Sequence, residues 1–242
     1  MGEYMFKQLT ERVYYLEHNE DTDRPVLGYI KGDKFSLMID GGNSADHVAI
    51  YMEELDKRQL SYPKFVAITH WHWDHTFGLS AINAVIIANS LTNKQLCKMR
   101  GWKWDEESMD KRVEIGEEIE FCNSMIKKEY PEKDKIEVIS ADMIFNDYLM
   151  LDLGGITCQM IKIGGCHSDD STIFYLPEEK ILFIGDAACE DLYHGESYDK
   201  DKLKKVISIL SEIEFDIVIE GHNEHTDKAE LLEYLQGKLT EI

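Results

Sequence analysis

Three histidines and an aspartate stand within six consecutive positions of the stretch Thr69–Gly78, which reads THWHWDHTFG. Neutral imidazole and carboxylate are the ligands that hold Zn²⁺ and similar divalent ions in proteins. The chain has nine histidines, so a third of them lie in this one segment. A histidine-rich surface loop over buried tryptophans is the alternative. We favour metal binding because the segment directly follows an apolar run, FVAI.

The spacing of these residues predicts how their side chains meet. In extended backbone, side chains at positions i, i+2 and i+4 point to one side. His70, His72 and Asp74 can therefore converge, with the two intervening tryptophans on the opposite side. His75 breaks this alternation, so the chain must turn at Asp74, and we expect the turn to enter a helix near Gly78. Such a turn lets four side chains serve two neighbouring ions.

Further ligands are expected singly, each near the end of a strand. His167 lies in GGCHSDDST after the apolar run 156–163, Asp186 ends ILFIGD, and His222 ends DIVIEGH. An isolated histidine or aspartate at a strand end is more often a cap or a surface residue. The ordered occurrence of all three after the first motif favours a joint metal centre.

Strands and helices alternate along the chain and must position these residues. Short β-rich runs recur, namely PVLGYI, FSLMID, FVAIT, AVIIA, ITCQMIKI, STIFYL, KILFIGD and DIVIEG. Stretches with helical spacing occur at 44–59, 90–99, 106–129, 199–211 and 226–239. The pattern predicts a mixed α/β fold, in which polar residues gather where strands end.

Residues 97–140 are longer and more charged than a simple crossover between strands needs. We predict that they form a helical insertion, acting either as a lid or as a dimer contact. No linker rich in Pro, Gly or Ser divides the chain, and no repeat is visible. The prediction is therefore a single domain over residues 1–242.

The composition of the chain disfavours some classes of binding partner and indicates a cellular location. The chain carries 47 acidic and 26 basic residues, a formal net charge of −21, which disfavours nucleic acid and anionic membrane surfaces. We expect a small-molecule substrate, no nucleic acid or membrane partner, and a homodimer as one open possibility. The five cysteines form no CxxC pair, and the start lacks the pattern of a secretory signal. These features predict a cytoplasmic protein with reduced thiols.

The ordered ligand set resembles the metallo-β-lactamase superfamily, whose members share His-x-His-x-Asp-His followed by separate His, Asp and His ligands. The resemblance runs from about Gly28 to His222. It implies a four-layer αβ/βα sandwich, with two mixed sheets face to face and helices on the outer faces. Carried over residue by residue, the ligands would be His70, His72 and His167 for a first metal, Asp74, His75 and His222 for a second, and Asp186 as the bridge.

The resemblance also implies a chemistry. Two divalent ions, zinc with manganese or iron as alternatives, would share a water and lower its pKa toward neutrality. The bridging hydroxide would attack a small ester, lactone, thioester or related bond, and Asp74 would pass the proton to the leaving group. Asp40 is expected to orient a ligand imidazole or to cap the turn after its strand. Tyr193 and His194 are candidate donors to the substrate.

The bridging Asp186 favours the glyoxalase II and lactonase branches. In several true β-lactamases the carboxylate bridge is missing or a cysteine binds the second metal. Two other functions on the same fold stay open. One is an iron-dependent oxidoreductase of the sulfur dioxygenase type, and the other is a phosphodiesterase or nuclease, which the net charge disfavours.

Overall fold

The structure is a computed structural model that describes residues 5–242, and within these residues the strands form two sheets. In spatial order, the first sheet contains β1 (Phe6–Gln8), β2 (Val13–Leu16), β3 (Leu27–Lys31), β4 (Ser36–Ile39), β5 (Phe65–Ala67), β6 (Val85–Asn89) and β7 (Met143–Phe145). The second contains β13 (Thr226–Asp227), β12 (Ile217–Glu220), β11 (Ile181–Gly185), β10 (Thr172–Leu176), β9 (Thr157–Lys162) and β8 (Tyr148–Asp152). Both sheets are mixed, because β4–β7 pair in parallel, as do β11 and β12, whereas the other pairs are antiparallel.

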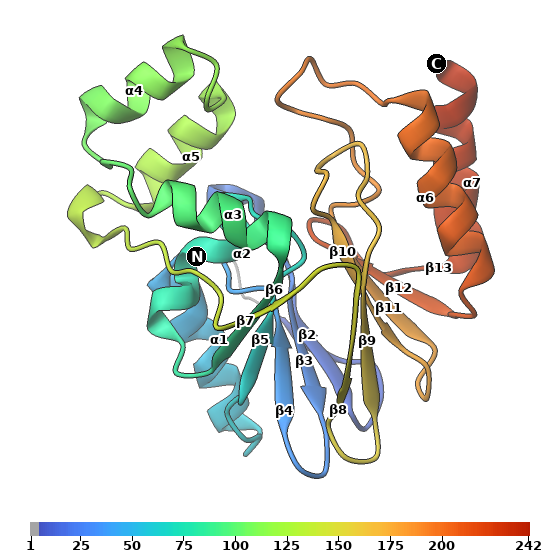
Figure 1. Cartoon of the computed structure of the whole chain (residues 1–242). Coiled ribbons are helices and arrows are strands. Elements are labelled where there is room, and N and C mark those ends of the chain that lie inside the picture. Colours follow the sequence, from blue (N-terminus) through green and yellow to red (C-terminus); the bar gives the residue numbers. More distant parts are fainter. Residues whose placement is uncertain (1–4) are drawn as a thin grey trace.

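Helices cover the outer face of each sheet (Figure 1). The α-helices of the described residues are α1 (Ala45–Lys57), α2 (Trp73–Thr76), α3 (Ser90–Met99), α4 (Glu106–Glu114), α5 (Glu120–Glu129), α6 (Lys200–Glu212) and α7 (Lys228–Glu241). Short 3₁₀ turns are η1 (Glu20–Thr22), η2 (Phe77–Ala81) and η3 (Lys133–Lys135). Helix α1 packs on the first sheet, and α6 and α7 pack on the second. The order of layers is helix, sheet, sheet, helix, so the predicted four-layer sandwich is confirmed.

Strand β4 shows why this sequence forms inner strands. Its residues alternate between two cores: Leu37 and Ile39 face the second sheet, whereas Met38 faces Tyr51 of α1. Both faces of the strand are buried, so its sequence reads as a continuous apolar run instead of an alternating one. Each such side chain contributes about 1.5–3 kcal/mol of burial free energy. The two cores together hold the strand ends, and the polar residues beyond them, in fixed positions.

The stretch 106–129, which has helical spacing throughout, is two helices and not one. Gly116 adopts a left-handed φ of 72° after α4. The N–H of Glu117 bonds to the oxygen of Arg112 at 2.8 Å, and that of Gly116 bonds to the oxygen of Val113 at 3.1 Å. This pair of hydrogen bonds is the Schellman motif, which ends a helix where glycine permits positive φ. The chain therefore restarts as α5 in a new direction.

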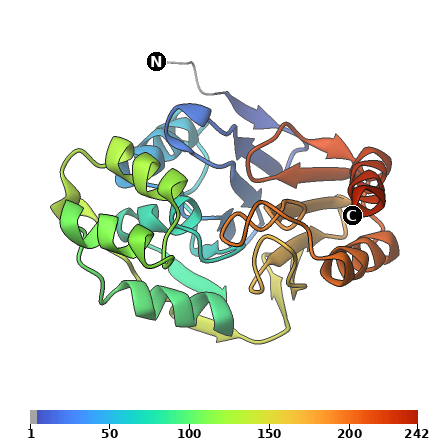
Figure 2. The same cartoon turned by 90° about the horizontal axis from the view of Figure 1, so that it is seen from above.

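Helices α4 and α5 lie beside the edge of the sandwich where the strands end (Figure 2). Met109 of α4 and Ile126 of α5 share a buried cluster with Trp73 and Phe77, which belong to the histidine-rich segment. Glu129 at the end of α5 also pairs with Arg24 at 2.7 Å. Residues 97–140 thus pack directly on the segment that carries the motif. Within residues 5–242, every helix is too short or too polar to cross a bilayer.

Candidate metal centre

The histidine-rich segment turns earlier than its spacing predicts. Helix α2 begins at Trp73, before the predicted start near Gly78, with His72 as the residue before its first turn, and the 3₁₀ turn η2 follows it from Phe77. The reason is local hydrogen bonding: Thr76 Oγ1 donates to the oxygen of His72 at 2.9 Å, and the N–H of His75 bonds to the same oxygen at 3.2 Å. Asp74 and His75 are therefore neighbours on one helical turn.

The structure brings all seven predicted ligands together beyond the ends of the strands. They form two clusters: His70, His72 and His167 in the first, and Asp74, His75, Asp186 and His222 in the second. Within each cluster the ligand atoms lie within 4.8 Å of one another. All are buried except His222, which is partly exposed.

Asp186 lies between the two clusters. Its Oδ2 is 3.3 Å from His75 Nε2 and 3.5 Å from His222 Nε2 in the second cluster. The same oxygen is 3.5 Å from His167 Nε2 and 3.7 Å from His70 Nε2 in the first. One carboxylate oxygen therefore faces both clusters, which is the place that a bridging ligand takes.

Unsatisfied polar atoms lie at this centre. Within residues 5–242, the buried atoms without a hydrogen-bond partner include His70 Nε2 and Asp186 Oδ1. An orphaned buried polar atom costs about 1–3 kcal/mol. Imidazole nitrogens and carboxylate oxygens are the donors that divalent transition ions prefer. The residues therefore fit a pair of divalent cations.

Two imidazoles of the first cluster, those of His70 and His72, are neutral at pH 7. Burial, and then the neighbouring rings of His75 and His72, hold the pKa of His70 well below its ordinary value. Burial, followed by the neighbouring ring of His167, lowers the pKa of His72 in the same way. Each of these two rings therefore keeps a lone pair for a cation at neutral pH.

The second cluster is ionised. Burial alone would raise the pKa of Asp186, but the nearby imidazoles of His222 and His75 hold it well below its ordinary value. For His222 the effect of burial is the opposite and lowers the pKa, but the carboxylates of Asp186 and Asp74 outweigh it and raise the pKa to about 9. A cation entering this cluster must displace the imidazolium proton.

Asp40 contacts a ligand imidazole, as its position after β4 predicts. Its Oδ2 accepts from His75 Nδ1 at 2.8 Å, and its Oδ1 accepts from the N–H of Thr69 at 2.8 Å. The Thr69 hydroxyl also bonds to Asp40 at 2.9 Å and lies 3.0 Å from His70 Nδ1. These bonds leave Nε2 of both rings facing the centre.

The sequence does not predict two further contacts of the ligands. One is with Thr69, although Thr69 directly precedes the first ligand. His167 Nδ1 donates to the main-chain oxygen of Glu190 at 3.0 Å. A main-chain acceptor leaves no signal in residue type, so the sequence could not have revealed it.

Tyr193 and His194 lie beside the centre, but both already have partners. Tyr193 Oη donates to Glu118 Oε1 at 2.7 Å, and its ring centroid lies 5.4 Å from that of His72. His194, whose side chain is 82% exposed, bonds to Asp191 at 2.8 Å. Donation by these residues to a substrate stays a prediction.

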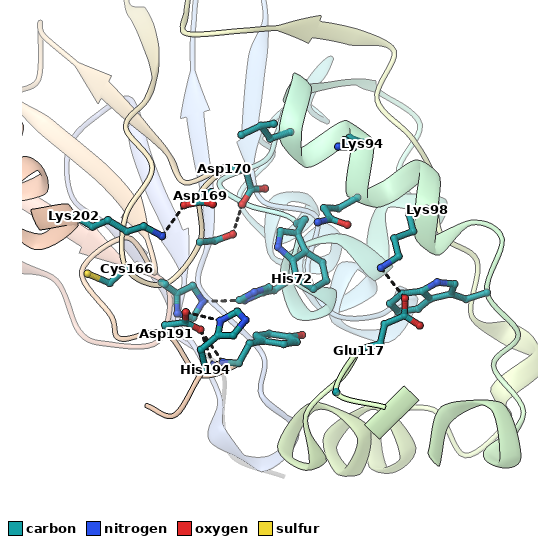
Figure 3. Close-up of a pocket in the computed structure, with 18 residues that line it drawn as sticks. His72, Lys94, Lys98, Glu117, Cys166, Asp169, Asp170, Asp191, His194 and Lys202 are labelled. Atoms are coloured by element: carbon teal, nitrogen blue, oxygen red, sulfur yellow. Dashed lines mark hydrogen bonds and ion pairs between the residues drawn. The ribbon is translucent and has the colours of Figure 1, made fainter. Parts of the chain in front are cut away.

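A pocket of about 550 Å³ opens onto the first cluster (Figure 3). His72 and His167 lie on its wall, together with Trp71 and Tyr193. One face of α3 forms another side, and the loop 166–170 forms a third. A pocket of this volume accepts a small molecule and places it against ligand side chains.

The fold and the paired clusters define a class of protein: a two-sheet α/β sandwich with a candidate dinuclear metal centre at one edge. The family model for the metallo-beta-lactamase superfamily matches residues 25–222, and the chain belongs to that superfamily.

Solved structures show the same fold at low sequence identity. A metallo-beta-lactamase from Pontibacter korlensis is 17% identical with a TM-score of 0.71, over 99% of this chain and 100% of that one. DIM-1 metallo-beta-lactamase is 20% identical with a TM-score of 0.67, over 99% and 98%. The sec-alkylsulfatase Pisa1 from Pseudomonas sp. is 15% identical with a TM-score of 0.72, over 98% of this chain and 41% of that one.

Proposed function

We propose that this protein is a hydrolase that uses two divalent metal ions to cleave a small ester, lactone, thioester or related bond. Zinc is the metal that we propose for both ions. The observation that supports it most is the position of Asp186 Oδ2, within 3.3–3.7 Å of imidazole nitrogens in both clusters. Two such metal ions would polarise the substrate oxygen and lower the pKa of a nearby water.

The residues of the chain supply the remaining functions. Asp74 Oδ2 lies 2.9 Å from His75 Nε2 and 3.0 Å from His222 Nε2, so this carboxylate is fixed at the centre. We propose that Asp74 accepts the proton that leaves the attacking water. Asp74 then delivers this proton to the leaving group. The rings of Trp71 and Tyr193, with centroids 5.6 Å apart, line the pocket beside His72.

The substrate is expected to be a small molecule. The net charge of −21 repels the phosphate backbone, which disfavours the nuclease alternative. The five cysteines are free, which supports a reducing compartment such as the cytoplasm.

Replacement of the proposed bridge tests the function. Asp186→Asn should lower the metal content below two ions per chain and abolish turnover on lactone, thioester and ester panels. Asp152→Asn is the matched control, because Asp152 lies on β8 with its side chain 64% exposed. Two ions and full activity in Asp186→Asn would contradict the proposal. If activity instead depended on a single iron per chain and consumed oxygen, the iron-dependent oxidoreductase would be favoured over the hydrolase.

A further inference from the structure

Three lysines line the pocket beside the metal centre, although the chain is strongly acidic. Lys94 and Lys98 come from α3, and Lys202 comes from the first turn of α6, on the other side of the pocket (Figure 3). Positive groups around a binding pocket select the charge of the ligand when they are not neutralised by their own neighbours.

Two of these lysines are neutralised. Lys98 Nζ lies 2.7 Å from Glu117 Oε1, and Lys202 Nζ lies 2.8 Å from Asp169 Oδ1. Lys98 also lies over the ring of Trp102, 5.4 Å from its centroid. Each of these ammonium groups therefore has a fixed counter-charge within the pocket wall.

The other carboxylates of the pocket are also engaged. Asp170, which is buried, accepts from Thr92 Oγ1 at 2.6 Å and from the hydroxyl of Ser168. Asp191 Oδ2 pairs with His194 Nδ1 at 2.8 Å, and its Oδ1 accepts two main-chain N–H groups at 2.9 and 3.1 Å. No carboxylate that lines the pocket is thus left to pair with the third lysine.

Lys94 keeps its charge uncompensated. Across residues 5–242 its ammonium group has no hydrogen bond or ion pair. It lies on the same face of α3 as Leu91 and Lys98, three residues before it and four residues after it, and this face lines the pocket. The opposite face, with Leu96 and Met99, is buried, so the helix orientation is fixed.

Resting on the proposed function, we propose that the substrate carries a carboxylate, at a distance from the bond that is cleaved, and that Lys94 binds this carboxylate. The reactive bond would lie against His72 and His167, and the linking atoms would contact the rings of Trp71 and Tyr193. Lys94 is then the residue that determines specificity for charge. The net charge of −21 repels anions at long range, so this local cation is what makes an anionic substrate acceptable.

Matched esters test the proposal without knowledge of the native substrate. One series comprises the mono-4-nitrophenyl esters of succinate, glutarate and adipate, and the other comprises the 4-nitrophenyl esters of methyl-terminated acids of the same chain lengths. The quantity to measure is the ratio of kcat/KM between partners of equal length, on zinc-loaded protein. Lys94→Met removes the charge and Lys94→Arg restores it. Lys64→Met is the control, because Lys64 is exposed at the start of β5, away from the strand ends that carry the centre.

At its best chain length, the wild type should prefer the carboxylated ester. Lys94→Met should lower this preference about fivefold, mainly through KM, which is the range for a solvent-accessible ion pair. Lys94→Arg and Lys64→Met should keep it, and added salt should weaken it. A wild type without the preference, or a preference that survives in Lys94→Met, would overturn the proposal.

Failure of the hydrolase function would be recognised separately. If the metal-loaded wild type cleaves neither series, the proposed function is in doubt, but binding of glutarate by calorimetry still reports on Lys94. Affinity that falls about fivefold in Lys94→Met and not in Lys64→Met supports the carboxylate site. Equal affinity in both variants and in the wild type rejects it.

Discussion

Replacement of Asp40 by Asn is a sharp test of how the centre is held, because it removes no predicted ligand. Asp40 Oδ2 accepts from His75 Nδ1 at 2.8 Å, and Oδ1 accepts from the N–H of Thr69 at 2.8 Å. Asp40 has a φ of 63°, and Asn tolerates this left-handed region better than most residues. The backbone should therefore stay in place.

The amide places a donor where the carboxylate had an acceptor. If its oxygen takes the N–H of Thr69, its NH₂ group faces His75 Nδ1, so that ring must carry its hydrogen on Nε2. Nε2 then presents a hydrogen and not a lone pair to Asp186, 3.3 Å away. Loss of such an outer partner costs about 10–100-fold in metal affinity, or about 1.4–2.8 kcal/mol. The metal-free fold should lose less, because burial raises the pKa of Asp40 and a neutral amide relieves that cost.

The assay is a zinc titration against a competing chelator, which resolves two dissociation constants. Asp40→Asn should weaken the site of the second cluster by about 10–100-fold and leave the first largely unchanged. Asp152→Asn should alter neither. Two unaltered constants, or equal weakening of both, would show that the contact between Asp40 and His75 does not orient a ligand.

Other predictions concern packing and protons. Gly221→Ala should lower turnover about 100-fold without removing a ligand, because the added Cβ would clash with Asp186 Oδ1. Gly237→Ala is the control, because a Cβ there meets open space, and equal turnover in the two variants would refute this packing argument. Zinc binding at the second cluster should release protons at pH 7, because the pKa of His222 is about 9 and the nearby carboxylates, against the effect of burial, hold the pKa of His75 well above its ordinary value. The affinity of this cluster for zinc should therefore rise with pH. Calorimetry in buffers of different ionisation enthalpy measures the protons released, and no proton release would contradict the prediction.

The ligand set could be predicted from sequence for a physical reason. Polar residues that follow buried strands gather at the strand ends. The two packed sheets bring the ends of β5, β11 and β12 to one edge of the sandwich, so Asp186 after β11 and His222 after β12 join the motif after β5. Residue type then selects the chemistry. Asp40 follows the same rule after β4, which is why its contact with His75 could be anticipated.

Other features depend on contacts that spacing does not encode. The start of α2 is set by the bond between Thr76 Oγ1 and the oxygen of His72. Tyr193 meets Glu118 across 75 residues, and no local pattern points to that pair. Strands β1, β7 and β13 are only two or three residues long, and β8 is partly exposed along its length. None of these four strands therefore shows a long apolar run.

The most direct test of the central claim is anomalous diffraction at the zinc edge from crystals of the zinc-loaded protein. We predict two peaks per chain, one among His70, His72 and His167 and one among Asp74, His75 and His222, with Asp186 in contact with both. A single peak, or peaks outside these side chains, would contradict the dinuclear centre on which the proposed hydrolysis depends.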